Sequence, residues 1–393
     1  GASTLDITAA KLALLGTGFS GITIGGVTQG GNISIAGAAT FANPVTFTTS
    51  GSTVLSGDLT ATGAAGITVT NALLVSSSNR AITSASGNIG LNSVDATGTA
   101  YGITLTTTSG AITVGRVGGS AALASLTTGS AGSITLTGAG VTTTGSQTYG
   151  NAVLLSADNS LSTTNSAILF SSTVDSSSST ARALTINVGT SNITFTGAVG
   201  GAQGLGNISL ASTGITTFSS TVNASALTQN SSTGTTAING ATITTTNAQT
   251  YGNAVTLGAA TTLNTSNSNI AFSSTLNSST TARNLTLNAG TGAVSFAGIV
   301  GGSLALGNVS STAATTTNGA AISGMGTYSI AGAAVINAAI SGVSSISVSG
   351  TSTIGASVTT TGAQSYVGNT TLINNITLTT TNSDVSFGGT LNG

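Results

Sequence analysis

The stretch Leu184-Thr185-Ile186-Asn187-Val188-Gly189-Thr190-Ser191-Asn192-Ile193-Thr194-Phe195 contains the pattern that decides the fold. In residues 184–186 and again in 193–195, an apolar residue, a threonine and a second apolar residue follow one another. Alternation over so few residues predicts short β-strands with one buried face, and the Gly, Ser and Asn residues between them predict a turn. The same alternation recurs along the chain at residues 22–24, 33–35, 67–69, 103–105, 134–136, 208–210, 285–287 and 294–296.

The spacing of these expected strands is regular. Strand starts fall at 153, 168, 184, 193 and 208, and then at 255, 270, 285, 294 and 309. Intervals of 9 and 15 residues add up to 24, which is close to the roughly 20 to 25 residues of one solenoid turn. The rhythm therefore favours coils that stack on one another.

A longer repeat is superimposed on this rhythm. The heptapeptide at 147–153 returns at 249–255, the Thr-Ala-Arg triplet at 180–182 returns at 281–283, and a third copy opens at 364–366. The offset falls from 102 to 101 within a Ser-rich turn, where stacked coils tolerate length changes because turns face solvent. We expect one continuous solenoid over 1–393, with irregular coils at 1–140, repeat modules at 141–244 and 245–359, and a truncated third module at 360–393.

The composition excludes most catalytic chemistry. The 393 residues include only 11 charged side chains, 3% of the total, and there is no Glu, His, Cys or Trp. Zinc and iron–sulfur sites need Cys or His ligands, and glycoside hydrolysis needs two juxtaposed carboxyl groups, whereas the six Asp residues are widely dispersed. Five cations are too few to neutralise a nucleic-acid backbone. We therefore expect a protein that is not an enzyme and has no metal, cofactor or nucleic-acid partner.

The chain also lacks the usual targeting signals. No apolar run reaches the roughly 18 to 20 residues of a membrane-spanning helix, and no basic-then-apolar segment opens the chain. The first residue is Gly1 rather than Met, and residues 390–393 fall inside a repeat, so we expect a processed or partial chain.

Two architectures fit short strands at short intervals. A module of 101 or 102 residues has the size of an antiparallel sandwich domain, but strands of three to five residues are short for that fold. The all-β alternative that we favour is a parallel β-helix, or β-solenoid, forming a single elongated rod of about 18 coils and about 85 Å. No charged or helical cap is visible at either end. We therefore expect the end coils to continue into more of the same chain or into a neighbouring subunit, and a cap of other structure would count against this.

The module is similar to repeats of a known group of bacterial surface proteins. Tyr-Gly-Asn-Ala-Val at 149–153 and 251–255, the Thr-Ala-Arg triplets, the Val-Gly-Gly turns at 199–201 and 300–302, and Gly-Asn at 206–207 and 307–308 carry the likeness. They resemble repeats of filamentous-haemagglutinin-type adhesins and related β-strand-repeat exoproteins over roughly 140–393. Membership would imply a right-handed parallel β-helix, secretion, an extracellular or cell-surface location, and a role in adhesion or extracellular matrix. The N-terminal secretion domain of that family is not recognisable in this sequence.

Two sets of recurring residues are candidate surface contacts. Tyr149, Tyr251 and Tyr366 occupy equivalent places, where the rings would either stack on carbohydrate or, as we favour, cover the ends of core ladders with their hydroxyls in water. Arg182 and Arg283 follow Ser/Thr-rich turns and are either repeated contacts to a sugar or neighbouring fibre or, as we favour, solvated turn residues.

The sequence thus predicts a structural component of a bacterial surface adhesin or extracellular fibre. Possible partners are copies of itself, further repeats joined end to end, carbohydrate, or a host or cell surface. One alternative is a filament or sheath subunit that stacks end to end. A second is an ice-binding solenoid, although the Thr positions shift between coils and no strict Thr-x-Thr column persists.

Overall fold

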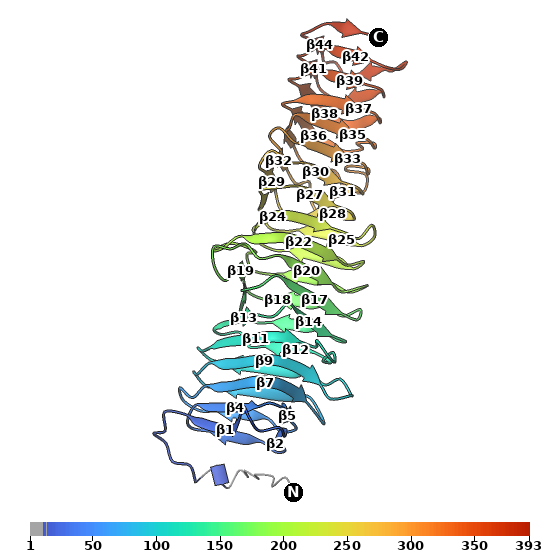
Figure 1. Cartoon of the computed structure of the whole chain (residues 1–393). Coiled ribbons are helices and arrows are strands. Elements are labelled where there is room, and N and C mark those ends of the chain that lie inside the picture. The colour runs from blue at the N-terminus through green and yellow to red at the C-terminus, as the bar shows by residue number, and fades with distance from the viewer. Residues whose placement is uncertain (1–10, 13) are drawn as a thin grey trace. The chain divides into compact units, whose positions relative to one another are not determined.

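The computed structural model describes residues 11–12 and 14–393, in which almost all regular structure is β-strand (Figure 1). The chain divides into two compact units, one ending at Gly197 and the other spanning Ala198–Gly393. Each unit is a β-solenoid, and the two units together contain about 18 turns. The ladders between described strands are parallel, which confirms the predicted fold class and excludes the antiparallel sandwich.

Three columns of paired strands form the sides of unit 1 and are called 1A, 1B and 1C here. Side 1A consists of β3 (Ala39–Phe41), β6 (Leu59–Ala61), β8 (Arg80–Ser84), β10 (Ile103–Thr107), β12 (Leu126–Thr128), β15 (Gln147–Tyr149), β18 (Ile168–Phe170) and β21 (Ile193–Phe195). Side 1B consists of β1 (Ile22–Gly26), β4 (Val45–Thr49), the first parts of β7 (Ile67–Val75), β9 (Ile89–Ala96) and β11 (Ala111–Val117), then β13 (Ser133–Leu136), β16 (Ala152–Leu155) and β19 (Val174–Ser176). Side 1C consists of β2 (Ile33–Ile35), β5 (Ser52–Leu55), the last parts of β7, β9 and β11, then β14 (Gly140–Thr143), β17 (Asn159–Thr163) and β20 (Leu184–Asn187).

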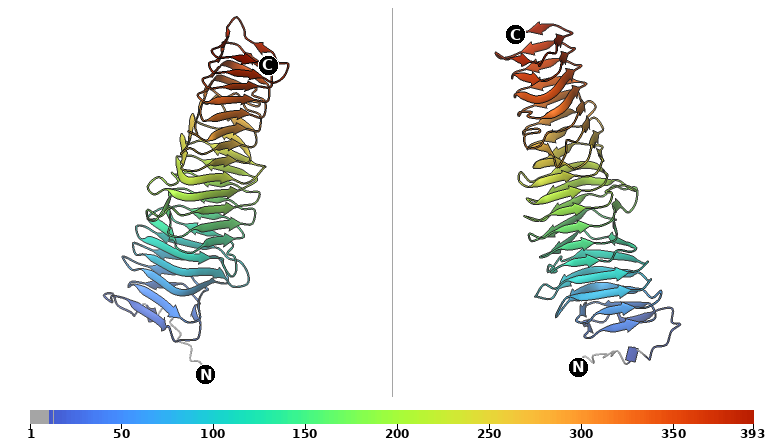
Figure 2. Two further views of the ribbon diagram at one scale, coloured as in Figure 1. Left: turned by 45° about the horizontal axis from the view of Figure 1, so that its top comes forward. Right: turned by 180° about the vertical axis from the view of Figure 1, so that it is seen from behind.

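Unit 2 has three corresponding columns, called 2A, 2B and 2C (Figure 2). Side 2A consists of β23 (Ile215–Phe218), β25 (Thr235–Ile238), β28 (Ala254–Leu257), β31 (Leu276–Ser278), single bridges at Val300 and Ile322, the start of β38 (Ile340–Val348), β40 (Val358–Thr360) and β43 (Leu378–Thr379). Side 2B consists of the start of β24 (Val222–Gln229), β26 (Thr242–Thr245), β29 (Thr261–Thr265), β32 (Leu285–Asn288), β34 (Val309–Thr312), the last parts of β36 (Met325–Ile330) and β38, then β41 (Gln364–Tyr366) and β44 (Val385–Phe387). Side 2C consists of the last parts of β22 (Leu205–Ala211) and β24, then β27 (Gln249–Tyr251), β30 (Ile270–Phe272), β33 (Ala293–Phe296), β35 (Thr315–Asn318), β37 (Ala333–Ile336), β39 (Ser352–Ile354), β42 (Thr370–Leu372) and β45 (Leu391–Asn392).

Two details differ from the sequence prediction. Strands β7 and β38 have nine residues rather than three to five, because each continues around a corner and pairs on two sides of its coil. Coil length also varies: paired positions Ile270 and Val294 are 24 residues apart, whereas Ala334 and Ser352 are only 18 apart.

The core is a set of aliphatic and aromatic stacks running from coil to coil. Burial alternates along the strands, as in β4 and β10. The inward positions there hold Val, Ile, Leu, Phe and one buried threonine each, Thr49 and Thr107, and the threonines between them point outward. Each fully buried Val or Leu contributes about 1.5 to 3 kcal/mol relative to exposure. Many such residues in every coil offset the chain entropy lost on ordering, which explains how a Gly-, Ser- and Thr-rich chain folds at all.

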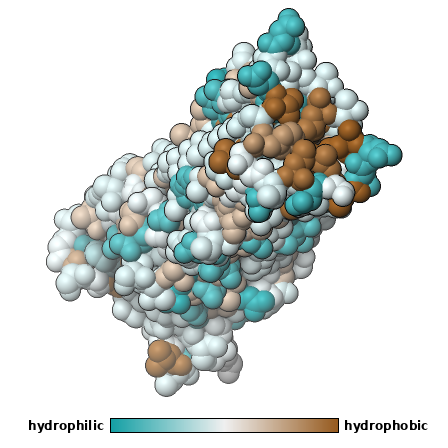
Figure 3. Space-filling model, turned by 90° about the horizontal axis from the view of Figure 1, so that it is seen from above, coloured by the Kyte–Doolittle hydropathy of each residue, from teal (hydrophilic) through white to brown (hydrophobic). Residues whose placement is uncertain are grey.

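The two end coils differ from each other. At the N-terminal end of unit 1, Lys11 and Leu12 lie in a helical turn and Leu12 is buried. At the C-terminal end of unit 2, the inward positions of β43 and β44 are only half-buried, and Leu391 in β45 is exposed. Figure 3 shows apolar side chains gathered on this face with polar residues around them.

Candidate functional site

The three repeated tyrosines are core residues. Tyr149, Tyr251 and Tyr366 are each 0% exposed, so the structure corrects their prediction as surface contacts. Both earlier interpretations fail, because a buried ring cannot stack on carbohydrate and its hydroxyl does not reach water. The rings instead begin aromatic stacks of near-parallel pairs. The ring centroids of Tyr149 and Phe170 lie 5.0 Å apart, and those of Tyr251 and Phe272 lie 5.1 Å apart.

Each tyrosine belongs to a buried arrangement that we call the Gln–Tyr clamp, made with the glutamine two residues earlier. The hydroxyl of Tyr149 donates to Oε1 of Gln147 at 3.0 Å. The Nε2 group of Gln147 donates to the carbonyl oxygen of Val141 at 3.2 Å and to that of Ser162, on the next coil, at 2.9 Å. The clamp therefore joins two sides of its own coil and ties that coil to the following one.

The other two modules repeat this geometry closely. In the second, Gln249 donates to Ile243 at 3.2 Å and to Asn264 at 2.8 Å, and Tyr251 donates to Gln249 at 3.0 Å. In the third, the corresponding acceptors of Gln364 are the carbonyl oxygens of Val358 at 3.0 Å and Thr379 at 2.8 Å, and the Tyr366 hydroxyl lies 3.2 Å from Gln364 Oε1. A threonine four residues before each glutamine supplies a further acceptor; these are Thr143, Thr245 and Thr360.

Burial fixes the protonation state of the clamp. Desolvation raises the pKa of Tyr149, Tyr251 and Tyr366 far above the ordinary value of a tyrosine. The hydroxyls therefore remain neutral donors under ordinary conditions. This arrangement offers no nucleophile or general base, and its chemistry is that of a structural hydrogen-bond network.

Within unit 2, the clamp occupies two different sides of the solenoid. Gln249 lies on side 2C and pairs with Ile270. Following the ladder of side 2C coil by coil leads to Thr370, whereas Gln364 lies on side 2B and pairs with Ile346. The length of the module is therefore not a whole number of coils. As a result, Gln364 lies on a different side of the solenoid from Gln249.

The two candidate arginines lie in the turns before β20 and β32 and are half-buried. The backbone N–H of Arg182 donates to Ser176 Oγ, and that of Arg283 donates to Ser278 Oγ, both at 2.9 Å. The Nε atom of each guanidinium is buried and has no hydrogen-bond partner among the described residues. The two turns differ in length by one residue but are closed by the same backbone-to-serine hydrogen bond, so the repeat is structural as well as sequential. Whether either arginine contacts another molecule stays a prediction.

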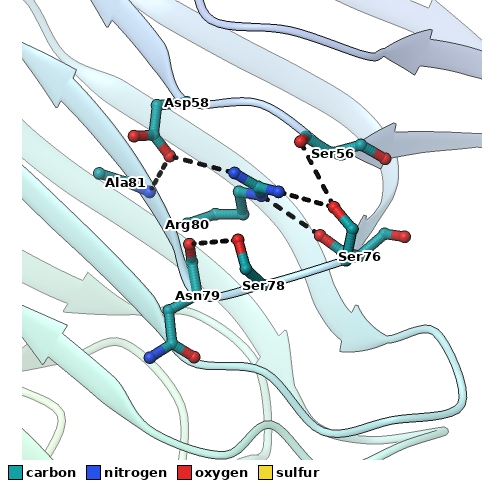
Figure 4. Close-up of polar contacts among 8 residues, drawn as sticks. Ser56, Asp58, Ser76, Ser78, Asn79, Arg80 and Ala81 are labelled. Carbon is teal, nitrogen blue, oxygen red and sulfur yellow. Dashed lines mark hydrogen bonds and ion pairs between the residues drawn. The ribbon is translucent and has the colours of Figure 1, made fainter.

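A third arginine, which sequence reasoning did not select, has a comparable place in unit 1. Asp58 Oδ1 accepts the N–H of Ala81 at 3.0 Å, as Asp158 Oδ1 accepts the N–H of Ala183. Arg80 lies 4.0 Å from Asp58 and donates to the carbonyl oxygen of Ser76 at 3.2 Å (Figure 4). The Arg-Ala dipeptide occurs both at 80–81 and at 182–183, and this repetition was the sequence signal that the two places are alike. The carboxylate is more than half exposed, so the ion pair contributes little to stability.

The Val-Gly-Gly turns are also more alike than the sequence suggested. Gly118, Gly200 and Gly301 have φ values of 65°, 68° and 70°, in the left-handed region that favours glycine. The turn after Gly118 is held by buried Asp95, whose Oδ1 accepts the N–H groups of residues 120 and 121, and Asn277 holds the turn after Gly301 in the same way. Residues 117–119, which are also Val-Gly-Gly, therefore form a turn of the same kind as 199–201 and 300–302.

Outward-facing hydroxyl groups form a continuous row on side 2B. The ladder register aligns eight consecutive hydroxyl positions, which are Thr242, Thr262, Thr286, Ser310, Ser329, Ser347, Ser365 and Ser386. The row beside it begins Thr244, Asn264, Asn288 and Thr312. A hydroxyl column thus persists, although a strict Thr-x-Thr column does not.

Comparison with known proteins gives no assignment. No protein-family model matches the chain, and neither the curated proteins nor the solved structures contain a significant match. Within the described residues, no helix is long and apolar enough to span a membrane, and no three acidic side chains gather as a metal site would need. The resemblance to filamentous-haemagglutinin-type repeats therefore depends on the quoted motifs alone.

Proposed function

We propose that this chain is a non-catalytic structural part of a bacterial surface adhesin or extracellular fibre, located outside the cell. The observation that carries the proposal is the position of the most strongly repeated motif. The glutamine and tyrosine side chains of the triplets 147–149, 249–251 and 364–366 lie in the interior, where the glutamines tie coil to coil. The feature that the module repeats is therefore a set of buried hydrogen bonds that hold neighbouring coils together.

The surface composition supports the same role. Outward positions are mostly Thr, Ser and Asn, and equivalent residues stand directly above one another, as Thr286 and Ser310 do. Like charges placed in such a column would repel, whereas neutral hydroxyl groups do not. A long neutral surface held by backbone ladders suits contact with other surfaces by many weak interactions.

An adhesion assay tests this proposal. Beads coated with the folded chain should bind epithelial cell layers or abiotic surfaces several-fold more than beads coated with an inert protein. Heat-denatured chain at equal coating density is the control, since an adhesive solenoid must be folded to act. Equal retention of all three bead types would contradict the proposal.

The hydroxyl row on side 2B favours a second candidate, ice binding. Its groups repeat at the coil spacing of about 4.8 Å, and such an array can order water. An ice-recrystallisation assay separates the two functions. Inhibition that disappears when Ser310, Ser329 and Ser347 are all replaced by lysine would support ice binding, and absence of inhibition by the unaltered chain would exclude it.

A further inference from the structure

The hydroxyl row on side 2B runs through most of unit 2. Its eight members, from Thr242 to Ser386, lie on consecutive coils, and the strand register places each beside the next. At a coil spacing of about 4.8 Å, seven steps give a row about 34 Å long. The parallel ladders thus hold these hydroxyl groups in one line along the stack.

The hydroxyl groups of this row are not used inside the protein. Those of the first seven members make no hydrogen bond with another described residue. That of Ser386 donates to the carbonyl oxygen of Gln364, at a long distance of 3.4 Å. Ser310, Ser329 and Ser347, in the middle of the row, are exposed. Because a hydroxyl group can donate one hydrogen bond and accept two, the row can bond to a molecule that lies along it.

Asparagines on both sides of the row form hydrogen bonds along the stack. On one side, Asn288 Nδ2 donates to Asn264 Oδ1 at 2.8 Å. On the other side, Oδ1 of Asn284 accepts the N–H of Asn308 at 2.8 Å. Neither flanking column is a continuous run of hydroxyl groups, so the row is a line and not a two-dimensional lattice. A line matches a chain polymer better than it matches a plane of ice.

The outward column of side 2C lacks this continuity. Thr250 pairs with Ala271, and Thr317 and Thr353 pair with Val335, so apolar residues interrupt the hydroxyl groups twice. This column has the same strand structure and a similar composition. It therefore provides an internal control for the continuous row.

The lack of charge around the row indicates which kind of molecule can bind there. Unit 2 contains only two charged side chains, Arg283 and Asp384, and neither belongs to the row. An ionic partner gains little attraction from such a surface. A neutral polymer with many hydroxyl groups can instead exchange hydrogen bonds with the row over its whole length. A β-1,4-linked sugar chain has this character, because it is extended and presents hydroxyl groups at every ring.

We propose that the hydroxyl row binds an extended, uncharged β-1,4-linked polysaccharide that lies along the stack. The inference rests on the proposed adhesive function and names the class of surface component that the chain holds. Each contact is weak, so binding depends on many contacts acting together. Short oligosaccharides, which span only one or two coils, should therefore bind far more weakly than the polymer.

Co-sedimentation with amorphous cellulose, an uncharged β-1,4-glucan, tests the inference with two matched variants. The first removes three hydroxyl groups from the middle of the row and combines Ser310→Val, Ser329→Val and Ser347→Val. The second removes three from the outward column of side 2C and combines Thr250→Val, Thr317→Val and Thr353→Val. The first should bind cellulose at least fivefold less than the unaltered chain, and the second should bind as well as the unaltered chain. Circular dichroism shows whether both variants keep their β-structure.

Competition on the unaltered chain tests the same inference without a substitution. Cellohexaose should displace the chain from cellulose, whereas cellobiose at equal sugar concentration should not. The inference is overturned if the unaltered chain does not sediment with cellulose, if the two variants lose binding equally, or if cellobiose competes as well as cellohexaose. The bead assay on the same proteins separates this result from the proposed function. Adhesion of the coated beads without any binding of cellulose would reject the polysaccharide and leave the adhesive role in place.

Discussion

At the residue scale, the glutamine of the Gln–Tyr clamp shows how a polar side chain can stabilise an apolar interior. Gln249 is 0% exposed, yet its amide group donates to two backbone carbonyls and accepts from Tyr251. A buried amide without partners would be destabilising, whereas one with all its partners specifies a single arrangement. The clamp therefore fixes which coil positions lie opposite one another.

Replacing this glutamine should be costly. Gln249→Leu removes the partner of the Tyr251 hydroxyl, of the buried Ile243 carbonyl and of the partly buried Asn264 carbonyl, and we expect a loss of about 3 kcal/mol in the free energy of unfolding. Thr250→Val, on the outward face of the same strand, is the matched control and should change stability by less than about 0.5 kcal/mol. Denaturant unfolding measures both, and equal effects would contradict the role of the clamp.

The buried tyrosines should set the alkaline limit of stability. Burial raises the pKa of Tyr149, Tyr251, Tyr328 and Tyr366 in the folded chain above the ordinary tyrosine value of 10.0. The protonated form is thus favoured by folding, so this stabilisation is complete below pH 10.0 and is lost as pH rises toward the folded-state values. Phenolate absorbance from these four residues should appear only together with loss of β-structure in circular dichroism. Reversible ionisation without unfolding would contradict their burial.

At the element scale, turns tolerate insertions and deletions that strands do not. The strands, their alternation and the stacking of coils were predictable, because periodicity of two and turn residues are local signals. The clamp was not, because its partners Val141 and Ser162 are distant from Gln147 in sequence and only the coil register brings them together. The tyrosines were placed at the surface for the same reason: repetition indicates importance but not which way a side chain points.

Insertions should show this difference directly. One alanine between Ser178 and Ser179 lengthens the turn where two modules already differ by one residue, and it should leave the melting temperature within a few degrees. One alanine between Ile168 and Leu169 in β18 should reverse the inward and outward positions and expose Phe170. We expect the second variant to be protease-sensitive, and equal resistance of the two would contradict the observed register.

The Val-Gly-Gly turn offers a second element-scale test. A Cβ atom at Gly301 would lie 1.9 Å from the carbonyl oxygen of Gly324, and its φ is positive, so Gly301→Ala should destabilise by about 2 kcal/mol or more. Gly302→Ala meets only the side chain of Ile299, which is 44% exposed and has room to shift, and its φ is not positive, so it should be tolerated better. Thermal unfolding of the two variants measures the difference, and a more damaging Gly302→Ala would show that the turn is wrongly described.

At the scale of the whole chain, the scarcity of charge and the stacking of coils belong together. A net charge of −1 from 11 charged groups leaves little for salt to screen, and the one ion pair found among the described residues is partly exposed. Composition was therefore a good guide to architecture.

The most direct test of the parallel coil stack uses engineered cysteine pairs, because the natural chain has no cysteine. Strands β32 and β34 pair Thr286 with Ser310 and Asn288 with Thr312. Double-cysteine variants at these two pairs should form disulfides rapidly under mild oxidation, while the crossed pairs 286 with 312 and 288 with 310 should not. Preferential cross-linking of the crossed pairs would mean that neighbouring strands run in opposite directions, and the solenoid would be wrong.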